Sequence, residues 1–212
     1  MSERWPGEPA EVQELEDDRL EEEDRVHELP LEEEPLLEEP EQVAPAHHAY
    51  GELDIPDDVN VLEGSPDGTR RGVAIVASRF NGEITNKLLE AALEELDEAG
   101  VQRNAITVMP VPGAFELPLA AMALAKTRRY ACVVALGCVV RGETPHFDFI
   151  ASEAASGLQL AALETGVPVA FGVLTVDVVE QALARVSKGA EAVRTALEMA
   201  DAFAQLRATA AL

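Results

Sequence analysis

Short apolar runs rich in β-branched residues alternate with long helical stretches from residue 72 onward, with only a few residues between them. The runs cover residues 73–77, 105–111, 131–140 and 168–176. This alternation is typical of α/β proteins. Each run is nearly continuously apolar, as expected where helices cover both faces of a parallel sheet. The pattern therefore predicts an α/β domain with at least four parallel strands.

The first helix is expected over residues 82–99, because apolar residues recur there every four positions. They form an inward stripe of Ile84, Leu88, Ala92 and Leu96. The acidic side chains expected on the outer face are Glu90, Glu94, Glu95 and Asp97. Gly100 follows directly and is placed to end the helix.

Four further helices are expected after the first. The second follows Glu116 with Pro118 in its first turn, and the third covers residues 147–165. The last two are expected over residues 177–186 and 189–207.

The first 57 residues differ sharply in charge from the rest of the chain. They carry 21 Asp or Glu against 3 Arg, a net charge of −18, whereas residues 58–212 carry 19 acids against 13 bases, a net charge of −6. We therefore interpret residues 1–57 as a disordered acidic tail and residues 58–212 as the folded domain. The tail has two interpretations, a solubilising segment or a segment that recruits a basic protein partner or cargo.

The overall charge excludes some classes of partner. With 16 Lys and Arg against 40 Asp and Glu, the net charge of −24 argues against binding to nucleic acid or to anionic lipid. The longest apolar run, residues 131–140, is shorter than the roughly 20 residues of a membrane-spanning helix. The acidic amino-terminal segment has no apolar signal region, so we expect a cytoplasmic protein.

The sequence predicts neither a disulfide nor a metal site. Cys132 and Cys138 fall in one predicted strand, where a rise of roughly 3.3 Å per residue separates them by about 20 Å, so both are expected to be buried thiols. His146 is the only histidine after residue 57, and no group of residues has the ligand spacing of a zinc site.

Ligands of open parallel sheets bind beyond the carboxyl ends of the strands, so the loops there are the candidate site. Phe80 and Phe115 lie in two of these loops, where a ring can stack on a planar ligand or close the edge of the core. The turn at residues 141–144 joins a strand to a helix, which suits a phosphate or another oxyanion. His146 beside this turn either transfers protons or caps the helix.

Common nucleotide-binding and hydrolase motifs are missing from the sequence. It contains no GxxxxGK[ST], no GxGxxG and no GxSxG. Nucleoside triphosphate hydrolysis, dinucleotide binding and nucleophilic hydrolysis by these signatures are therefore disfavoured.

Four loop motifs together resemble the 6,7-dimethyl-8-ribityllumazine synthase family of riboflavin biosynthesis, in order and in spacing, over about residues 59–207. They are Ser78-Arg79-Phe80-Asn81, Pro112-Gly113-Ala114-Phe115-Glu116-Leu117-Pro118, Leu136-Gly137-Cys138-Val139-Val140-Arg141-Gly142-Glu143-Thr144-Pro145-His146-Phe147 and Phe171-Gly172-Val173-Leu174-Thr175. The resemblance implies a flavodoxin-like three-layer α/β/α sandwich. It also implies condensation of 5-amino-6-(D-ribitylamino)uracil with 3,4-dihydroxy-2-butanone 4-phosphate, without a cofactor.

The same resemblance implies roles for individual residues. His146 would be the catalytic residue that transfers protons. The uracil and its ribityl chain would be bound by Phe80, Asn81, Ala114, Phe115, Glu116, Cys138, Val139, Val140 and Phe171. The phosphate would be bound by Gly142, Glu143, Thr144, Arg185 and Lys188, although the loop that holds Lys188 is shorter than is usual in the family. Without the resemblance, Arg185 would be interpreted as a solvated helix charge.

The resemblance further implies that the pocket lies between subunits. Phe171 and Arg185 would come from the neighbour of the chain that supplies Phe80 and His146. A pentamer is the smallest assembly that this requires, and some members of the family form 60-subunit icosahedral shells. The apolar segment 59–64 is the predicted strand that each chain adds to its neighbour's sheet.

Two other functions are compatible with the sequence. The domain could bind a flavin or a lumazine without catalysis, or it could be a structural protein that forms a shell.

Overall fold

The computed structural model describes residues 53–210, so the predictions for residues 1–52 lie outside the described part of the chain. The strands are β1 (Val73–Ser78), β2 (Ile106–Val111), β3 (Cys132–Val140) and β4 (Val169–Val176). The α-helices are α1 (Gly82–Glu98), α2 (Leu117–Lys126), α3 (His146–Thr165), α4 (Val179–Leu183) and α5 (Lys188–Ala210). Two 3₁₀ turns, η1 (Arg103–Ala105) and η2 (Ala114–Glu116), precede β2 and α2.

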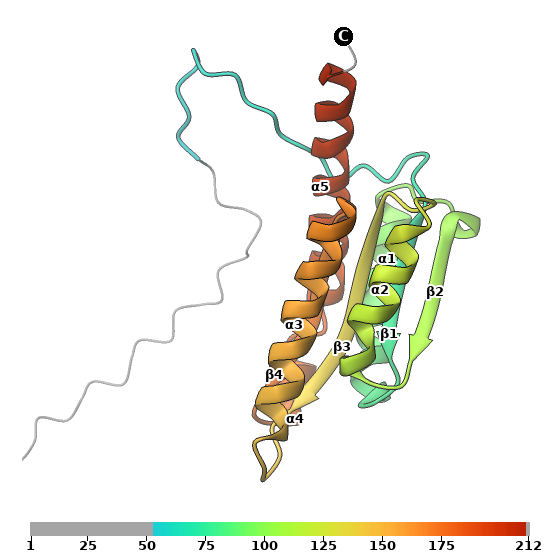
Figure 1. Ribbon diagram of the computed structural model, residues 1–212, viewed down its shortest axis with the longest axis vertical. Helices are drawn as coiled ribbons and strands as arrows, with labels where there is room; N and C mark the ends of the chain where they lie inside the picture. The colour runs from blue at the N-terminus through green and yellow to red at the C-terminus, as the bar shows by residue number, and fades with distance from the viewer. Residues whose placement is uncertain (1–52, 211–212) are drawn as a thin grey trace, which may run out of the picture. The chain divides into compact units, whose positions relative to one another are not determined.

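The four strands form one parallel sheet in the order β2-β1-β3-β4, which confirms the predicted sheet. Val73 of β1 is level with Ile106 of β2 and with Cys132 of β3. All strands therefore end at one edge of the sheet, at the bottom of Figure 1. The loops that follow the strands meet there.

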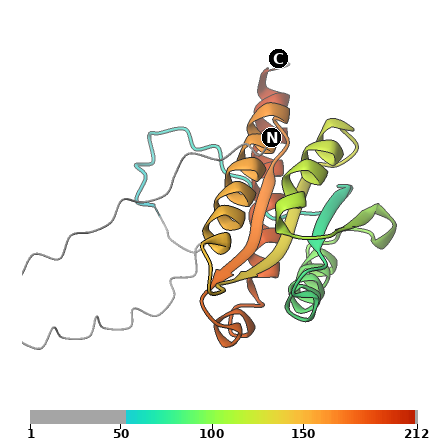
Figure 2. The ribbon, with the colours of Figure 1, turned by 60° about the horizontal axis from the view of Figure 1, so that its bottom comes forward.

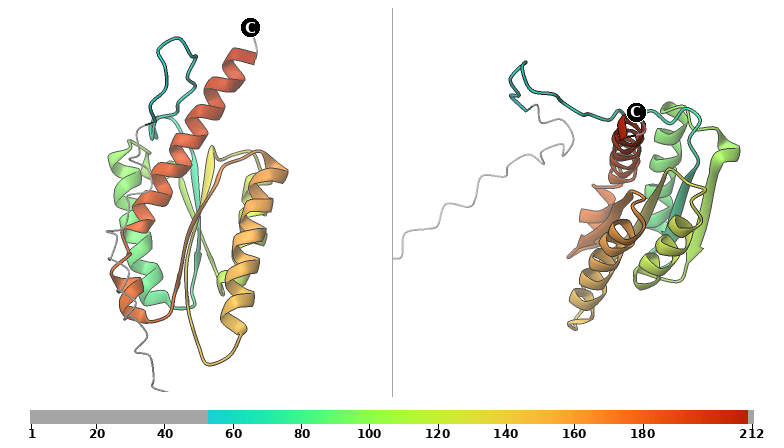
Figure 3. Two further views of the ribbon diagram at one scale, coloured as in Figure 1. Left: turned by 90° about the vertical axis from the view of Figure 1, so that its left-hand side faces the viewer. Right: turned by 45° about the horizontal axis from the view of Figure 1, so that its top comes forward.

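Helices cover both faces of the sheet, and the three layers are visible in the left view of Figure 3. One cluster of buried side chains joins β1 and β3 to α1 and α5, and the other joins them to α2 and α3. This is the three-layer α/β/α sandwich that the resemblance implies. None of the helices in residues 53–210 is long and apolar enough to cross a membrane.

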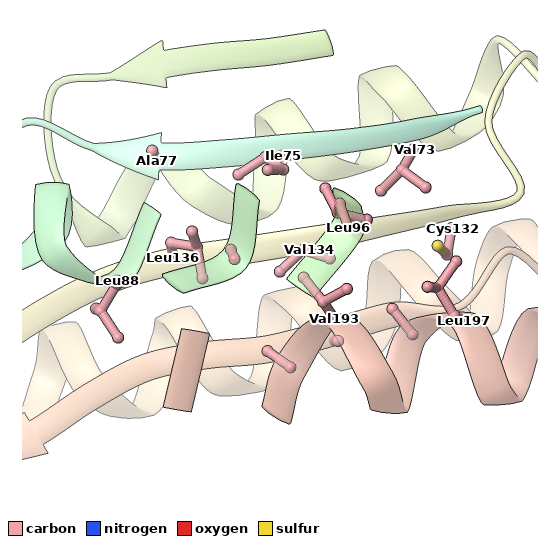
Figure 4. Packing of buried hydrophobic residues seen from close by; sticks show 14 of the residues in the cluster. Val73, Ile75, Ala77, Leu88, Leu96, Cys132, Val134, Leu136, Val193 and Leu197 are labelled. Carbon is pink, nitrogen blue, oxygen red and sulfur yellow. The ribbon is translucent and has the colours of Figure 1, made fainter. Parts of the chain in front are cut away.

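The core between the sheet and the α1/α5 layer consists of interlocking aliphatic side chains (Figure 4). The cluster includes Ile75 of β1, Leu136 of β3, Leu88 of α1 and Leu197 of α5, and all four are completely buried. Burying an aliphatic side chain of this size stabilises a fold by about 1.5–3 kcal/mol. This layer fixes β1 and β3, the two central strands.

The first helix also shows a difference from the sequence pattern. Glu95 was expected on the outer face, but its carboxylate accepts a hydrogen bond from Arg194 of α5, and its side chain is only 12% exposed. Burial raises the pKa of Glu95 above its ordinary value, and the charge of Arg194 opposes this shift. The helical period alone could not show that a second helix packs along this face. Gly100 follows α1 with a left-handed φ of 84°, which confirms the predicted helix end.

Three further expectations need correction. β2 is an edge strand with Val108 and Met109 largely exposed, so helices do not cover both of its faces. The helix expected over residues 177–186 is shorter in the structure, where α4 spans only Val179–Leu183. Residues 59–64 form no strand within this chain. A single chain does not test their exchange into a neighbour's sheet, which stays a prediction.

Asp201 of α5 holds the segment that leads into β1. Its carboxylate accepts hydrogen bonds from the Ser65 N–H at 3.1 Å and from Gln205 Nε2 at 2.8 Å, and it pairs with Arg71. Gln205 also donates to the carbonyl of Glu63 at 2.9 Å. The hydrogen bonds from Ser65 and Gln205, with the charge of Arg71, lower the pKa of Asp201. This cluster, which we call the Asp201 clamp, lies at the end of the domain opposite the carboxyl edge of the sheet.

The contact between α1 and α5 predicts the effect of one substitution. A Cβ atom on Gly189 would lie 2.1 Å from the carbonyl oxygen of Leu88, a backbone atom that cannot rotate away. We expect Gly189→Ala to lower the free energy of unfolding by roughly 1–3 kcal/mol in urea titrations at a fixed protein concentration. The control is Gly82→Ala, since a Cβ there would meet nothing within 4 Å. Equal stability of the two variants would contradict this packing.

Candidate functional site

A pocket of about 410 Å³ opens at the carboxyl edge of the sheet, the edge that is turned toward the viewer in Figure 2. Its walls come from the loops after β1, β2 and β3 and from the first turns of α3. The lining residues are Phe80, Asn81, Gly113, Ala114, Phe115, Glu116, Cys138, Val139, Val140, Gly142, Thr144, His146, Phe147 and Ile150. Three segments that are distant in sequence therefore build one site.

The loop after β1 is held by backbone pairing and by one side chain. The N–H of Phe80 donates to the carbonyl of Pro112 at 3.0 Å, which joins this loop to the loop after β2. Asn81 adopts a left-handed conformation with φ of 55°, which asparagine tolerates well, and its Nδ2 donates to the carbonyl of Cys138 at 2.9 Å. These contacts leave the Phe80 ring 71% exposed at the mouth of the pocket.

The loop after β2 adds a second ring and a carboxylate. Phe115 is 57% exposed and lines the pocket, so the alternative that it closes the edge of the core is wrong. One carboxylate oxygen of Glu116 accepts a hydrogen bond from the Gly113 N–H at 2.9 Å. Glu116 thus fixes its own loop and is also one of the residues that line the pocket.

The third wall runs from β3 into α3. Cys138 and Val139 are buried residues of β3 whose surfaces reach the pocket, and His146 is the exposed first residue of α3. Gly142 and Thr144 line the pocket between them. The amino end of α3 therefore presents a turn with polar backbone groups beside an imidazole.

The contacts of Arg141 in this turn were not evident from the sequence. Its Nε donates to Asp177 Oδ1 at 2.8 Å and its Nη1 to Asp148 Oδ1 at 3.2 Å, while the guanidinium lies 4.1 Å from the centre of the Phe147 ring. The hydrogen bonds to Asp177 and Asp148 raise the pKa of Arg141. In the sequence, Arg141 is marked only by its place between a strand and Gly142. Its partners could not be recognised there, because Asp177 follows β4 and Asp148 lies in the first turn of α3.

The other predicted residues lie in a second hollow, beside β4. It measures about 240 Å³ and is lined by Phe171 to Val176 with Arg185 and Lys188. Phe171 is 46% exposed, and Lys188 is paired with Glu191 at 2.6 Å. No residue is shared between the linings of this hollow and of the first pocket. Glu143 is exposed and lines neither of them.

The first pocket has the chemistry to bind a planar ring that carries polar and anionic groups. Two exposed rings can stack on a ring system, and the start of α3 offers N–H groups to an anion. His146 is the only imidazole among its lining residues. In residues 53–210, no group of three or more His, Cys, Asp or Glu side chains could hold a metal ion.

Comparison with known protein families matches residues 71–204 to 6,7-dimethyl-8-ribityllumazine synthase. The match covers more than half of the chain and includes both the pocket and the hollow beside β4. The chain belongs to this family. Lumazine synthases are transferases of riboflavin biosynthesis. The membership of this chain in the family associates its pocket, with its aromatic side chains and anion-binding turn, with riboflavin biosynthesis.

Cys138 lies at the pocket wall, so its reactivity can be predicted. Burial raises the pKa of the Cys138 thiol to about 11 and that of Cys132 to about 12. At about pH 8 both side chains are neutral thiols, which are poor nucleophiles. We expect iodoacetamide to label neither cysteine in the folded protein within minutes, but to label both in denaturant, as measured by mass spectrometry. Rapid labelling of Cys138 in the folded protein would contradict this environment.

Proposed function

We propose that this chain condenses 5-amino-6-(D-ribitylamino)uracil with 3,4-dihydroxy-2-butanone 4-phosphate to 6,7-dimethyl-8-ribityllumazine, with release of phosphate and water. The observation that carries the proposal is the pocket in which Phe80, Glu116 and His146 converge from three separate loops. Its family membership agrees with this reaction. A domain that only binds a lumazine would need the rings but not the imidazole beside an anion-binding turn.

The reaction needs orientation and proton transfer more than covalent help from the protein. The uracil amine first forms an imine with the ketone and loses water. A proton then leaves the adjacent hydroxyl-bearing carbon as phosphate is expelled, and the resulting enol tautomerises to a ketone. The ribitylamino nitrogen attacks this ketone, and loss of a second water closes the ring. We assign proton transfer to His146, because it lies next to the turn proposed to bind the phosphate.

The substrate-binding roles follow the walls of the pocket. We propose that Phe80 and Phe115 flank the pyrimidine and that the free oxygen of Glu116 accepts hydrogen bonds from the ribityl hydroxyls. The backbone near Ala114 and the end of β3 at Val139 complete this part. The N–H groups of Gly142, Glu143 and Thr144 would hold the phosphate.

We further propose that the complete site forms between two subunits of a homo-oligomer, at least a pentamer. The separation of Phe171 and Arg185 from the first pocket supports this arrangement, because each chain then carries two complementary halves. Apolar side chains of α2 and α3 also face outward without cover in the described chain: Leu119, Phe149, Leu160 and Leu163 are 52–76% exposed. Exposed apolar surface of this kind marks protein interfaces.

The direct test mixes the purified full-length protein with both substrates and follows lumazine absorbance above the uncatalysed rate. We expect clear acceleration, and we expect His146→Ala to lower the turnover number by roughly 10- to 100-fold, since orientation by the pocket persists. The control is His47→Ala, which changes a histidine outside the described residues. A folded wild-type protein without acceleration would favour a non-catalytic binding module, and an unaffected His146→Ala would remove His146 from the reaction.

The shared site predicts complementation between two defective variants. His146→Ala damages the first pocket and Arg185→Ala damages the hollow beside β4. When the two variants are assembled together in equal amounts, about one quarter of the sites should regain both intact halves. We expect the mixed assembly to be more active than the mean of the two separate assemblies. Activity equal to that mean would show that both halves belong to a site within one chain.

A further inference from the structure

Arg141 lies between the first pocket and the hollow beside β4, which belong to two different sites of the proposed assembly, but it lines neither of them. The linings include its neighbours Val140 and Gly142, and the hollow beside β4 includes Val176, whose carbonyl accepts a hydrogen bond from the Arg141 N–H at 2.8 Å. A cation next to an anion-binding turn would first be taken for a ligand of the anion. Its contacts point to a different role.

The guanidinium of Arg141 contacts two carboxylates and one aromatic ring. Nε donates to Asp177, the residue that follows β4, and Nη1 donates to Asp148 in the first turn of α3. The guanidinium also stacks on the ring of Phe147 at 4.1 Å. A planar fork that bridges two carboxylates and covers a ring is the geometry for which arginine is suited and lysine is not.

The turn at residues 142–144, which these contacts enclose, makes few contacts of its own. In the described part of the chain, no hydrogen bond involves Gly142, Glu143 or Thr144, and a Cβ on Gly142 would meet nothing within 4 Å. The turn begins at Arg141 and leads to Asp148, and Arg141 joins these two ends. The position of its N–H groups therefore depends on the Arg141 contacts.

Further contacts lead from Asp177 toward the hollow beside β4, which the proposed assembly places in a neighbouring site. The N–H of Asp177 donates to Gln181 Oε1 at 2.9 Å, and the carbonyl of Gln181 accepts a hydrogen bond from Arg185 Nη1 at 2.8 Å. Asp177 therefore contacts Arg141 through its carboxylate and α4 through its backbone N–H.

We propose that Arg141 and Asp177 are positioning residues for phosphate recognition, which hold the 142–144 turn in place without contacting the phosphate. This inference rests on the proposed function, since it names the part of that site that orients the anion-binding groups. Exposed ion pairs contribute little to global stability, so their loss should alter the turn and leave the fold intact.

The charges of the two residues allow a decisive experiment, because a ligand role and a positioning role predict opposite signs. Removing the carboxylate with Asp177→Ala should strengthen phosphate binding if Arg141 is a direct ligand, since the cation is then released. It should weaken binding if Arg141 is a positioning residue. Arg141→Ala weakens binding in both cases, and Arg141→Lys restores it only where charge alone is needed.

We would compare Arg141→Ala, Arg141→Lys, Asp177→Ala and the double alanine variant in the full-length protein. We expect each to raise the KM for the butanone phosphate by roughly tenfold, with the KM for the uracil within about twofold of wild type, and the double variant to be no worse than either single one. Binding of inorganic phosphate, measured by calorimetry, should weaken in parallel while the thermal midpoint stays unchanged. The matched control is Arg103→Ala, a surface arginine paired with Asp97 at 3.7 Å and absent from both linings.

The outcomes separate the two proposals. If wild type turns over the substrates and the Arg141 and Asp177 variants behave like Arg103→Ala, the positioning role is wrong and the proposed function stands. If Asp177→Ala binds phosphate more tightly, or Arg141→Lys behaves like wild type, Arg141 is a direct phosphate ligand. If wild type shows neither turnover nor phosphate binding, both proposals fail.

Discussion

The complete burial of the central strand β1 is the constraint on which the rest of the structure depends. Residues 73–76 are inaccessible to solvent, and the backbone of β1 pairs with β2 on one side and with β3 on the other. A slip by one residue would exchange the faces of every side chain in the strand, so packing by α1 and α5 on one face and α2 and α3 on the other fixes the register. The register in turn brings the ends of β1, β2 and β3 to one level, where the pocket forms.

Much of this organisation could be predicted from the sequence. Apolar runs and helical periods predicted the four strands and the helices to within a few residues. In a three-layer sandwich the buried positions of strands and helices are occupied by apolar residues, so the pattern is visible in the sequence. The loops after the strands could likewise be recognised as the candidate site from topology alone. The motifs then identified the residues that line the pocket, such as Phe80 and His146.

What the sequence could not show were contacts between segments that are distant along the chain. The pairing of Glu95 with Arg194 requires that α1 and α5 lie side by side, and an acidic residue at the edge of a helical stripe is otherwise indistinguishable from a solvated one. The engagement of Arg141 by Asp177 has the same origin. The exposed faces of β2 could not be inferred either, since the apolar composition of a strand does not show how much of it the helices of its own chain cover.

The separation of the two linings also determines which parts of the chain place the residues on each side of the ligand. In a site within one chain, the residues on both sides of the ligand must be placed by the same core, so that any repacking affects them together. In the proposed shared site, the loops after β1, β2 and β3 with the start of α3 carry one half, and β4 with Arg185 and Lys188 carries the other. Within each chain, Arg141 and Asp177 connect the two linings at the surface of the domain.

The Asp201 clamp has a consequence for the amino-terminal segment. Ser65 and Arg71 are bonded to Asp201 of α5, at the end of the domain opposite the pocket. A segment joined ahead of this clamp therefore enters the domain at the end away from the pocket loops. This position is for that reason a suitable point for attaching a foreign domain.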